Sequence, residues 1–180
     1  MDLWFDEIDS PVGTIVVVSD GENLCALDFG DYGERMHRLM AARYGEVRLI
    51  RAENPQGFSE RVRAYLAGDM ASLDDIPVST GGTPFQAQVW AALRSIPAGT
   101  TITYGELAAR VGRPTAARAV GMTNSLNPIA IVLPCHRVIG ANASLTGYAG
   151  GLERKRWLLE HEGAYPKAAT PAALQERLAV

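Results

Sequence analysis

Cysteine is scarce in this chain of 180 residues, which has only Cys25 and Cys135. The two lie far apart, no CxxC pair occurs, and no Cys/His cluster has the spacing of metal ligands. These absences argue against a disulfide scaffold and a structural zinc site, so we expect no bound metal. Each thiol is then either a small buried hydrophobe or a reactive group.

Long apolar runs are also missing. No stretch of uncharged apolar residues is long enough to span a membrane, and the start, MDLWFDEIDSP, has acids where a signal peptide needs a basic region. The hydrophobic content of 47% and charged content of 21% are ordinary for a soluble globular protein. We expect a cytoplasmic protein without membrane contact, built as one generous domain or two small ones.

The chain as a whole has no excess of basic residues, since its formal net charge is −3. Residues 1–82 carry 7 basic and 15 acidic side chains, a net −8, whereas residues 83–165 carry 8 basic and 4 acidic, a net +4. Only the second half is therefore suited to face a polyanion.

The first half predicts a small α+β domain without a catalytic constellation. Cys25 lies in an alternating strand pattern and His37 lies on a helix without partners, so both are interpreted as structural or surface residues. Turn residues at 20–23 separate two strand-like segments in the manner of a hairpin. The expected elements are strands at 15–18 and 24–29, helices at 34–44 and 58–66, and a short strand near Val47.

A linker is expected at 79–82, where the sequence reads STGG, and a helix follows it. Thr83-Pro84 is a suitable helix start because proline is favoured in the first turn. Apolar residues at three-to-four-residue spacing predict its buried face. They are Phe85, Val89, Leu93 and Ile96, with Gln86, Gln88 and Trp90 as its flank.

Two short helices, at 105–112 and over about ten residues from Thr115, surround a turn at Arg113-Pro114. This is the outline of a helix-turn-helix, although many helical hairpins bind nothing. In the second helix small residues surround one long basic residue, Arg118. That pattern fits either close helix packing or a slim helix that enters a narrow groove with one side chain as a wedge.

The apolar segment 127–133 is expected to be a buried strand that ends at Pro134 and presents Cys135, His136 and Arg137. A thiol becomes a good nucleophile as thiolate, and a neighbouring histidine is the usual base. Adjacent residues of a strand point in opposite directions, so the pair must lie in a turn or communicate through a water. An isolated Cys-His dipeptide is also compatible with a purely structural role.

A glycine-rich loop at 147–151 precedes a predicted helix from Leu152 to Glu162, which Gly163 closes. Such a loop can place backbone amides and one aromatic ring against a flat ligand. Glu162 is a candidate to orient His136. The basic cluster 154–156 is interpreted mainly as a solvated face.

These motifs together resemble the O6-alkylguanine-DNA alkyltransferases, also called methylated-DNA–protein-cysteine methyltransferases. The resemblance covers about residues 83–163, and several motifs occur in the family's order and spacing. They are Phe85-Gln86, Val89-Trp90, 117–121 (ARAVG), Asn127-Pro128, 134–140 (PCHRVIG), 147–151 (GYAGG) and 161–163 (HEG).

The resemblance implies roles for the residues of the chemistry. Cys135 matches the alkyl-accepting nucleophile, His136 the water-linked base, and Glu162 the carboxylate that orients it. Asn127 matches the asparagine that braces the turn of the cysteine. Tyr104 matches the tyrosine that crowds the target phosphate and helps protonate the departing guanine.

The resemblance also implies residues that contact DNA and the flipped base. The helix from Thr115 would enter the minor groove of double-stranded DNA, with Arg118 filling the vacated base stack. Other implied DNA contacts are at Tyr104, Gly105, Arg113 and Ala141, and the substrate pocket is assigned to Tyr148, Ala149 and Val138. Some relatives carry serine where this chain has Ala149, so a side-chain hydroxyl contact is lost here.

The implied architecture is an α+β protein. A small N-terminal α/β domain of ribonuclease H-like fold (1–82) precedes a mainly helical, winged helix-turn-helix domain (83–165) and a tail (166–180). The implied reaction is one irreversible alkyl transfer per monomer, without a cofactor. Two alternatives remain at this point: a non-catalytic sensor or regulator of alkylated DNA with the same winged helix, and a Cys-His hydrolase.

Overall fold

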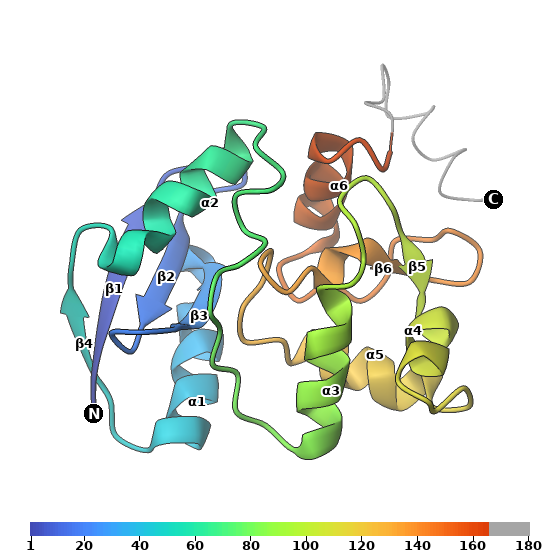
Figure 1. The fold of residues 1–180 in the computed structure, drawn as a ribbon, viewed down its shortest axis with the longest axis horizontal. Helices are drawn as coiled ribbons and strands as arrows, with labels where there is room; N and C mark the ends of the chain where they lie inside the picture. The colour runs from blue at the N-terminus through green and yellow to red at the C-terminus, as the bar shows by residue number, and fades with distance from the viewer. Residues whose placement is uncertain (166–180) are drawn as a thin grey trace. The chain divides into compact units, whose positions relative to one another are not determined.

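The computed structural model describes residues 1–165 and divides into two compact units (Figure 1). Among the described residues, the first contains 1–83 and 128–132, and the second contains 84–127 and 133–165. Residues 128–132, which the sequence analysis placed in the second domain, thus group with the first unit. The expected tail, 166–180, lies outside the described residues.

The first unit is built on a four-stranded sheet in the order β3-β2-β1-β4, with β1 antiparallel to β2 and parallel to β4. The hairpin between β2 and β3 forms because Asp20 accepts hydrogen bonds from the backbone N–H groups of Glu22 and Asn23. Strand β1 was not predicted, because its acidic residues interrupt the apolar alternation. The strands are β1 (Asp2–Ile8), β2 (Ile15–Ser19), β3 (Leu24–Phe29) and β4 (Arg48–Arg51).

Helices α1 (Gly33–Tyr44) and α2 (Phe58–Leu66) cover opposite faces of this sheet. Leu3 of β1 packs in one cluster with methionines of α1, while Asp6, three residues along the strand, accepts a hydrogen bond from Ser59 of α2 at 2.7 Å. Residues an odd number apart on a strand point to opposite faces, so the two helices sandwich the sheet. Short 3-10 turns at Gly30–Tyr32 and Pro55–Gly57 precede them.

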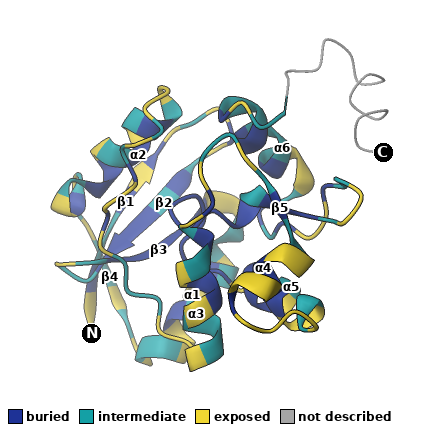
Figure 2. Ribbon diagram, turned by 45° about the vertical axis from the view of Figure 1, so that its right-hand side comes forward, coloured by how far each residue is buried: buried dark blue, intermediate teal, exposed yellow. Residues whose placement is uncertain are grey.

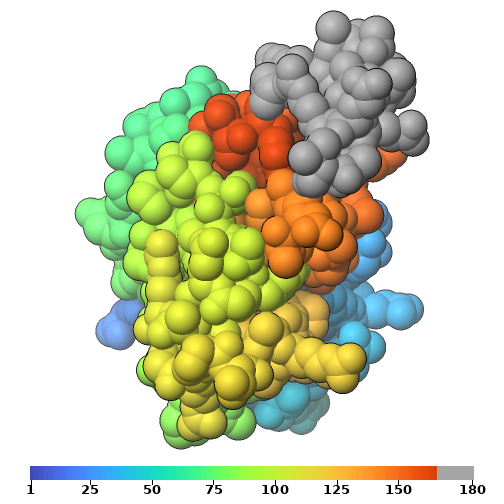
Figure 3. Space-filling view, turned by 90° about the vertical axis from the view of Figure 1, so that its right-hand side faces the viewer, coloured from blue at the N-terminus to red at the C-terminus, as the bar shows by residue number. Residues whose placement is uncertain are grey.

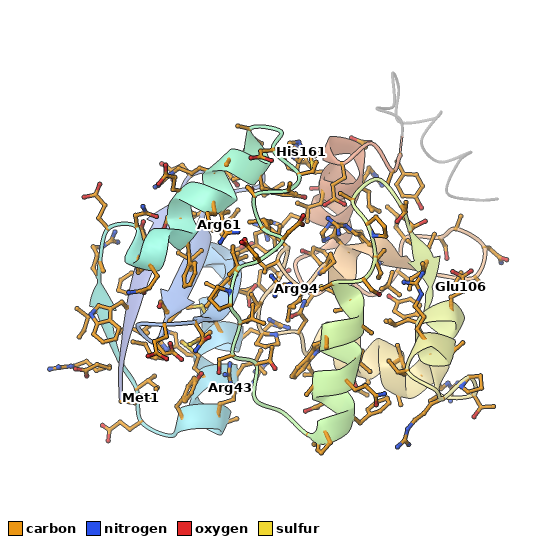
Figure 4. All side chains as sticks on the ribbon, viewed as in Figure 1. Met1, Arg43, Arg61, Arg94, Glu106 and His161 are labelled. Atoms are coloured by element: carbon orange, nitrogen blue, oxygen red, sulfur yellow. The ribbon has the colours of Figure 1, made fainter. Side chains whose placement is uncertain are left out.

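The outer edge of β3 is covered by two short segments rather than by another strand. Leu24 pairs with the backbone at 77–79, and Leu27 pairs with the backbone at 128–130. Arg43, labelled in Figure 4, donates to the carbonyl oxygens of Cys25 and Ser79, which fixes α1 to the first of these segments. An unpaired strand edge can pair with another chain. The two segments prevent this at β3 because they cover its outer edge.

The second unit packs α3, α4 and α5 together and adds a small parallel pair, β5 and β6. Trp90, which the sequence analysis placed on the flank of α3, is buried instead, and its indole N–H donates to the carbonyl oxygen of Thr123 at 3.0 Å. That interpretation was wrong because a third helix, α5, covers this side of α3. The elements are α3 (Pro84–Leu93), β5 (Ile102–Thr103), α4 (Tyr104–Arg110), α5 (Ala117–Ser125), η3 (Cys135–Arg137), β6 (Val138–Ile139) and α6 (Leu152–His161).

Local signals in the sequence set the two ends of α4. Thr103 and Glu106 form a reciprocal capping box at the start of α4, and Gly112, with φ of 75°, makes the turn that follows this helix. The combination of sheet and helices confirms the α+β class. No helix within residues 1–165 is long and apolar enough to cross a membrane.

Candidate active site

Cys135 begins the 3-10 turn η3, in which it is 5% exposed and the adjacent His136 is 0% exposed. The strand expected at 127–133 does not form: only Ile129 makes an isolated bridge, and turns follow it. Val132 donates to the carbonyl oxygen of Ala130, and Cys135 donates to that of Leu133 at 2.7 Å. Both are bonds of γ-turns, which fold the apolar run back on itself.

Ile131 lies at the centre of the first γ-turn with φ of 71°, a backbone conformation that a β-branched residue rarely adopts. Pro128 and Pro134 flank the segment and supply no N–H group, so an extended strand would lack ladder donors at both ends. The consequence is that Cys135 and His136 follow each other in a turn, which was one of the two arrangements left open by the sequence.

His136 is held by a buried ionic network with Glu162 and Arg137. Its Nε2 lies 2.9 Å from Oε2 of Glu162, and the guanidinium of Arg137 binds both oxygens of that carboxylate at 2.7 and 2.8 Å. Arg137 also donates to the carbonyl oxygen of Ile96 at 2.6 Å. The network therefore joins η3 to the end of α6 and to the segment after α3.

The electrostatics of this network fix which atoms carry protons. Burial disfavours the ion at Glu162, but its hydrogen bonds with His136 and Arg137 and the positive charge of Arg137 outweigh this effect and lower the pKa of this carboxyl well below its usual range. Burial lowers the pKa of His136, against the attraction of Glu162. We conclude that a bidentate arginine keeps Glu162 ionised while the imidazole of His136 is neutral.

A neutral His136 facing a carboxylate carries its proton on Nε2, because an ionised carboxylate only accepts hydrogen bonds. Its other ring nitrogen, Nδ1, is buried and has no hydrogen-bond partner within the described part of the chain. The arrangement leaves Nδ1 as a proton acceptor next to the thiol-bearing residue.

Two asparagines, Asn124 in α5 and Asn127 just after it, hold the backbone around Cys135. The side-chain amide of Asn127 donates to the carbonyl oxygen of Leu133 at 2.7 Å, and that of Asn124 donates to the carbonyl oxygen of Cys135 at 3.3 Å. Both side chains are buried. Asn127 was predicted to brace this turn, whereas Asn124 was given no role.

Tyr104 begins α4 and reaches toward the loop that precedes α6. Its hydroxyl donates to the carbonyl oxygen of Thr146 at 3.1 Å. Burial raises the pKa of Tyr104, and hydrogen bonds with Thr146 and the side chain of Asn124 act in the opposite direction.

Lys155 is 0% exposed and belongs to the same neighbourhood. Its Nζ donates to the carbonyl oxygens of Val138 at 2.6 Å and Thr146 at 2.8 Å, and it lies 5.9 Å from the ring centroid of Tyr104. Burial lowers the pKa of Lys155 to about 8. The solvated face expected at 154–156 is therefore wrong for Lys155. Its helical spacing to the buried Leu158 and Leu159 was the signal that could have placed it inside.

The remaining predicted residues are distributed over the surface and the loops of the second unit. Figure 2 shows exposed positions along α4 and α5, and Figure 3 views the face that these helices form. Within the 147–151 segment Tyr148 is buried and Ala149 is half-buried. The exposed predicted residues are Gly105, Arg113, Arg118 and Ala141.

Among residues 1–165 no group of three His, Cys, Asp or Glu side chains is placed to hold a metal ion. A buried thiol beside a neutral histidine and an ionised carboxylate, on a fold with a helix-turn-helix, instead defines a class of proteins that combine a cysteine nucleophile with a nucleic-acid-binding domain.

Comparison with known proteins identifies the family within this class. Residues 84–164 match the family described as 6-O-methylguanine DNA methyltransferase, DNA binding domain, and residues 5–80 match the ribonuclease-like domain of the same protein. The chain therefore belongs to the 6-O-methylguanine DNA methyltransferase family.

Individual relatives agree with this assignment. A methylated-DNA–protein-cysteine methyltransferase of Shigella flexneri is 50% identical over 164 residues, which cover 89% of this chain and 96% of the relative. One of Mycobacterium tuberculosis is 44% identical over 175 residues, 96% of this chain and 97% of the relative. The crystal structure of the M. tuberculosis O6-methylguanine methyltransferase superposes with a TM-score of 0.75 at 38% identity, covering 96% of this chain and 99% of that one. Its complex with DNA gives 0.75 at 40% identity, with 91% and 94% covered.

Proposed function

We propose that this protein repairs O6-alkylated guanine in DNA by transferring the alkyl group to its own Cys135, once per molecule. The observation that carries this proposal is the turn of Cys135 and His136, backed by the ionised Glu162, in a chain whose relatives are named for this transfer. A solved relative in complex with DNA supports DNA as the partner.

In the proposed reaction Nδ1 of His136 takes the proton of Cys135, directly or through a water. The thiolate then attacks the alkyl carbon, the sulfur–carbon bond forms, and the bond from that carbon to O6 of guanine breaks. Glu162 supports this step because it fixes the tautomer of His136 that leaves Nδ1 free to accept. A thioether does not reverse, so the protein acts as a single-turnover transferase.

The departing guanine needs a proton, and Tyr104 is proposed to supply it. Asn127 is proposed to brace the turn that presents Cys135, through its bond to the carbonyl oxygen of Leu133. The reaction needs no cofactor, since the thiolate is the nucleophile and guanine is the leaving group.

The target base must leave the duplex to reach a buried thiol. We propose that α5 enters the minor groove, where the small residues around Arg118 allow close approach and Arg118 fills the vacated stack. Phosphate contacts are proposed for the first residues of α4 and for exposed loop positions. They are Tyr104, Gly105, Arg113 and Ala141.

The flipped base is proposed to lie between the 147–151 segment and the main chain near the nucleophile. Tyr148 and Ala149 form one wall, and the main chain at Cys135 and Val138 reads the edge of the base. The protein is proposed to act as a monomer. The presence of Cys135 argues against a sensor that only binds alkylated DNA, and a Cys-His hydrolase would release many products per molecule.

Intact mass measurement after incubation with O6-methylguanine DNA tests the proposal. We expect a single increase of roughly 14 Da, since CH₃ replaces the thiol hydrogen, and peptide mapping should place it on Cys135. Cys135→Ala should not react yet should still bind DNA, and Cys25→Ala is the matched control that should react normally. Repeated turnover, or a label on Cys25, would overturn the proposal.

A further inference from the structure

Asn124 lies on the last turn of α5 and is 3% exposed. Its Nδ2 donates to the carbonyl oxygen of Cys135, while its Oδ1 has no hydrogen-bond partner among the described residues. Leaving a buried polar atom unpaired destabilises a fold, and an apolar side chain of similar shape would avoid that cost. Packing alone would favour an apolar residue at position 124, so the hydrogen bonding of Nδ2 is the feature that requires an asparagine there.

Tyr104 lies against the same face of α5. A Cβ placed on Gly121 would be 3.8 and 3.9 Å from two ring carbons of Tyr104, and Gly121 is one helical turn before Asn124. The hydrogen bond with the side chain of Asn124 lowers the pKa of Tyr104, although the larger effect of burial raises it. Asn124 thus donates to the backbone of Cys135 and lies one helical turn from the point where the ring of Tyr104 meets α5.

We propose that Asn124 is a positioning residue for the leaving group, whose amide nitrogen bridges the carbonyl oxygen of Cys135 and the hydroxyl oxygen of Tyr104. This inference rests on the proposed alkyl transfer. A primary amide carries two N–H groups, so both contacts can be made at once. The bridge sets the distance between the nucleophile and the proton donor through one short side chain on a helix.

The chemistry explains why such a bridge matters. As the sulfur–carbon bond forms and the carbon–oxygen bond to guanine breaks, the negative charge moves onto guanine, which takes the proton of Tyr104. The phenolate oxygen then accepts the N–H of Asn124, which stabilises it. The proton that His136 took from Cys135 returns to Tyr104 through water, so the net change is the exchange of a thiol and an alkylguanine for a thioether and guanine.

Two reagents separate this role from general damage to the site. Alkyl transfer from O6-methylguanine DNA needs protonation of the leaving group, whereas carboxamidomethylation of Cys135 by iodoacetamide releases iodide and needs none. For Asn124→Leu we expect the rate of alkyl transfer to fall about tenfold, the loss of about one hydrogen bond to a charged group, while the iodoacetamide rate changes less than twofold. A parallel fall with both reagents would overturn the proposal, because Asn124 would then act only on Cys135.

A double-mutant cycle with Tyr104→Phe tests the connection directly. If Asn124 acts through the hydroxyl of Tyr104, Asn124→Leu in the Tyr104→Phe background should reduce the rate of alkyl transfer by no more than about twofold. The proposal would be contradicted if the fold reductions in rate caused by the two single substitutions multiplied in the double variant. Failure of the wild-type protein to methylate Cys135 would instead remove the proposed function itself.

A second variant, Asn124→Ala, covers the case in which leucine prevents folding. It removes the amide without adding apolar volume, and its melting temperature shows whether the fold is kept. The same two rates and the same cycle apply, and the same outcomes decide for or against the bridge.

Discussion

The buried carboxylate of Glu162 contacts both His136 and Arg137, and it has a different role toward each of them. Toward His136 it selects a tautomer, and toward Arg137 it forms a bidentate ion pair that ties α6 to η3. A change at Glu162 therefore affects both chemistry and stability, and the experiment has to separate them.

We predict that Glu162→Gln lowers the alkyl-transfer rate near neutral pH by about tenfold or more, because His136 becomes a weaker and less oriented base. Raising the pH should restore part of the rate, since more thiolate then forms without assistance. The measurement is the single-turnover rate as a function of pH. Superimposable profiles for variant and wild type would remove Glu162 from the activation of Cys135.

Thermal stability provides the second readout for this variant. Removing one charge of a buried pair destabilises by about 3 kcal/mol, so a lower melting temperature is expected. The pKa of Glu162 is lowered in the folded protein, so its contribution to stability is present above the pKa of the unfolded carboxyl and is lost as the pH falls through the folded value. The variant should lack this acid-dependent part. Glu160→Gln, on the same helix, is the matched control that should change neither readout.

At the scale of residues, the sequence could predict the identity of the reactive group but not its full surroundings. Cys135 and His136 are adjacent in the chain, and the family resemblance indicated Glu162. The buried contacts of Arg137 and Lys155 were not predicted, because a charged residue in a helix or turn is usually exposed to solvent. Their burial depends on carboxylate and carbonyl oxygens supplied by segments distant in the sequence.

At the scale of elements, α5 combines small residues with one exposed arginine. We predict that Arg118→Ala slows repair of O6-methylguanine in duplex DNA at least tenfold, while the reaction with free O6-benzylguanine changes less than twofold. The reason is that flipping a base costs a few kcal/mol, and only the duplex needs its stack filled.

Single-turnover rates on the two substrates decide this prediction. Arg38→Ala, an exposed arginine of α1, is the control and should leave both rates unchanged. Equal losses on duplex and free base would assign Arg118 to the chemistry or to the fold.

Element prediction succeeded where local signals are strong and failed where tertiary hydrogen bonds decide. The bounds of β3 and α2 were predicted at Leu24–Phe29 and Phe58–Leu66, where hairpin residues and helical spacing leave little choice. The apolar run at 127–133 has the composition of a strand, yet its γ-turns and its single bridge to Leu27 depend on the edge of a distant sheet. Composition alone could not distinguish a buried turn from a buried strand.

At the scale of the whole molecule, a chain of net charge −3 is proposed to bind a polyanion through one face. Three exposed arginines lie on or between α4 and α5: Arg110, Arg113 and Arg118. With about three phosphates neutralised, the logarithm of the affinity should fall with the logarithm of the salt concentration with a slope of about −2.7. This corresponds to a loss of about 40-fold between 50 and 200 mM salt.

Titration of a fluorescent duplex at several salt concentrations checks the value. Arg113→Ala should reduce the slope by about one, while Arg38→Ala should leave it unchanged. A slope steeper than about −6 would indicate that basic residues outside the helix pair also contact phosphate.

The chain passes between its two units three times, since residues 128–132 return to the first unit before the nucleophile is reached. Neither unit is therefore encoded by one continuous segment of the gene. A gene cut after residue 83 would encode a first fragment in which β3 lacks its partner segment at 128–130. The second fragment would carry that segment without the strand that it pairs with. Recombination that exchanges one half between relatives would therefore have to match the β3 edge to the partner at 128–130. Substitutions in β3 and at these positions are expected to change together across descendants.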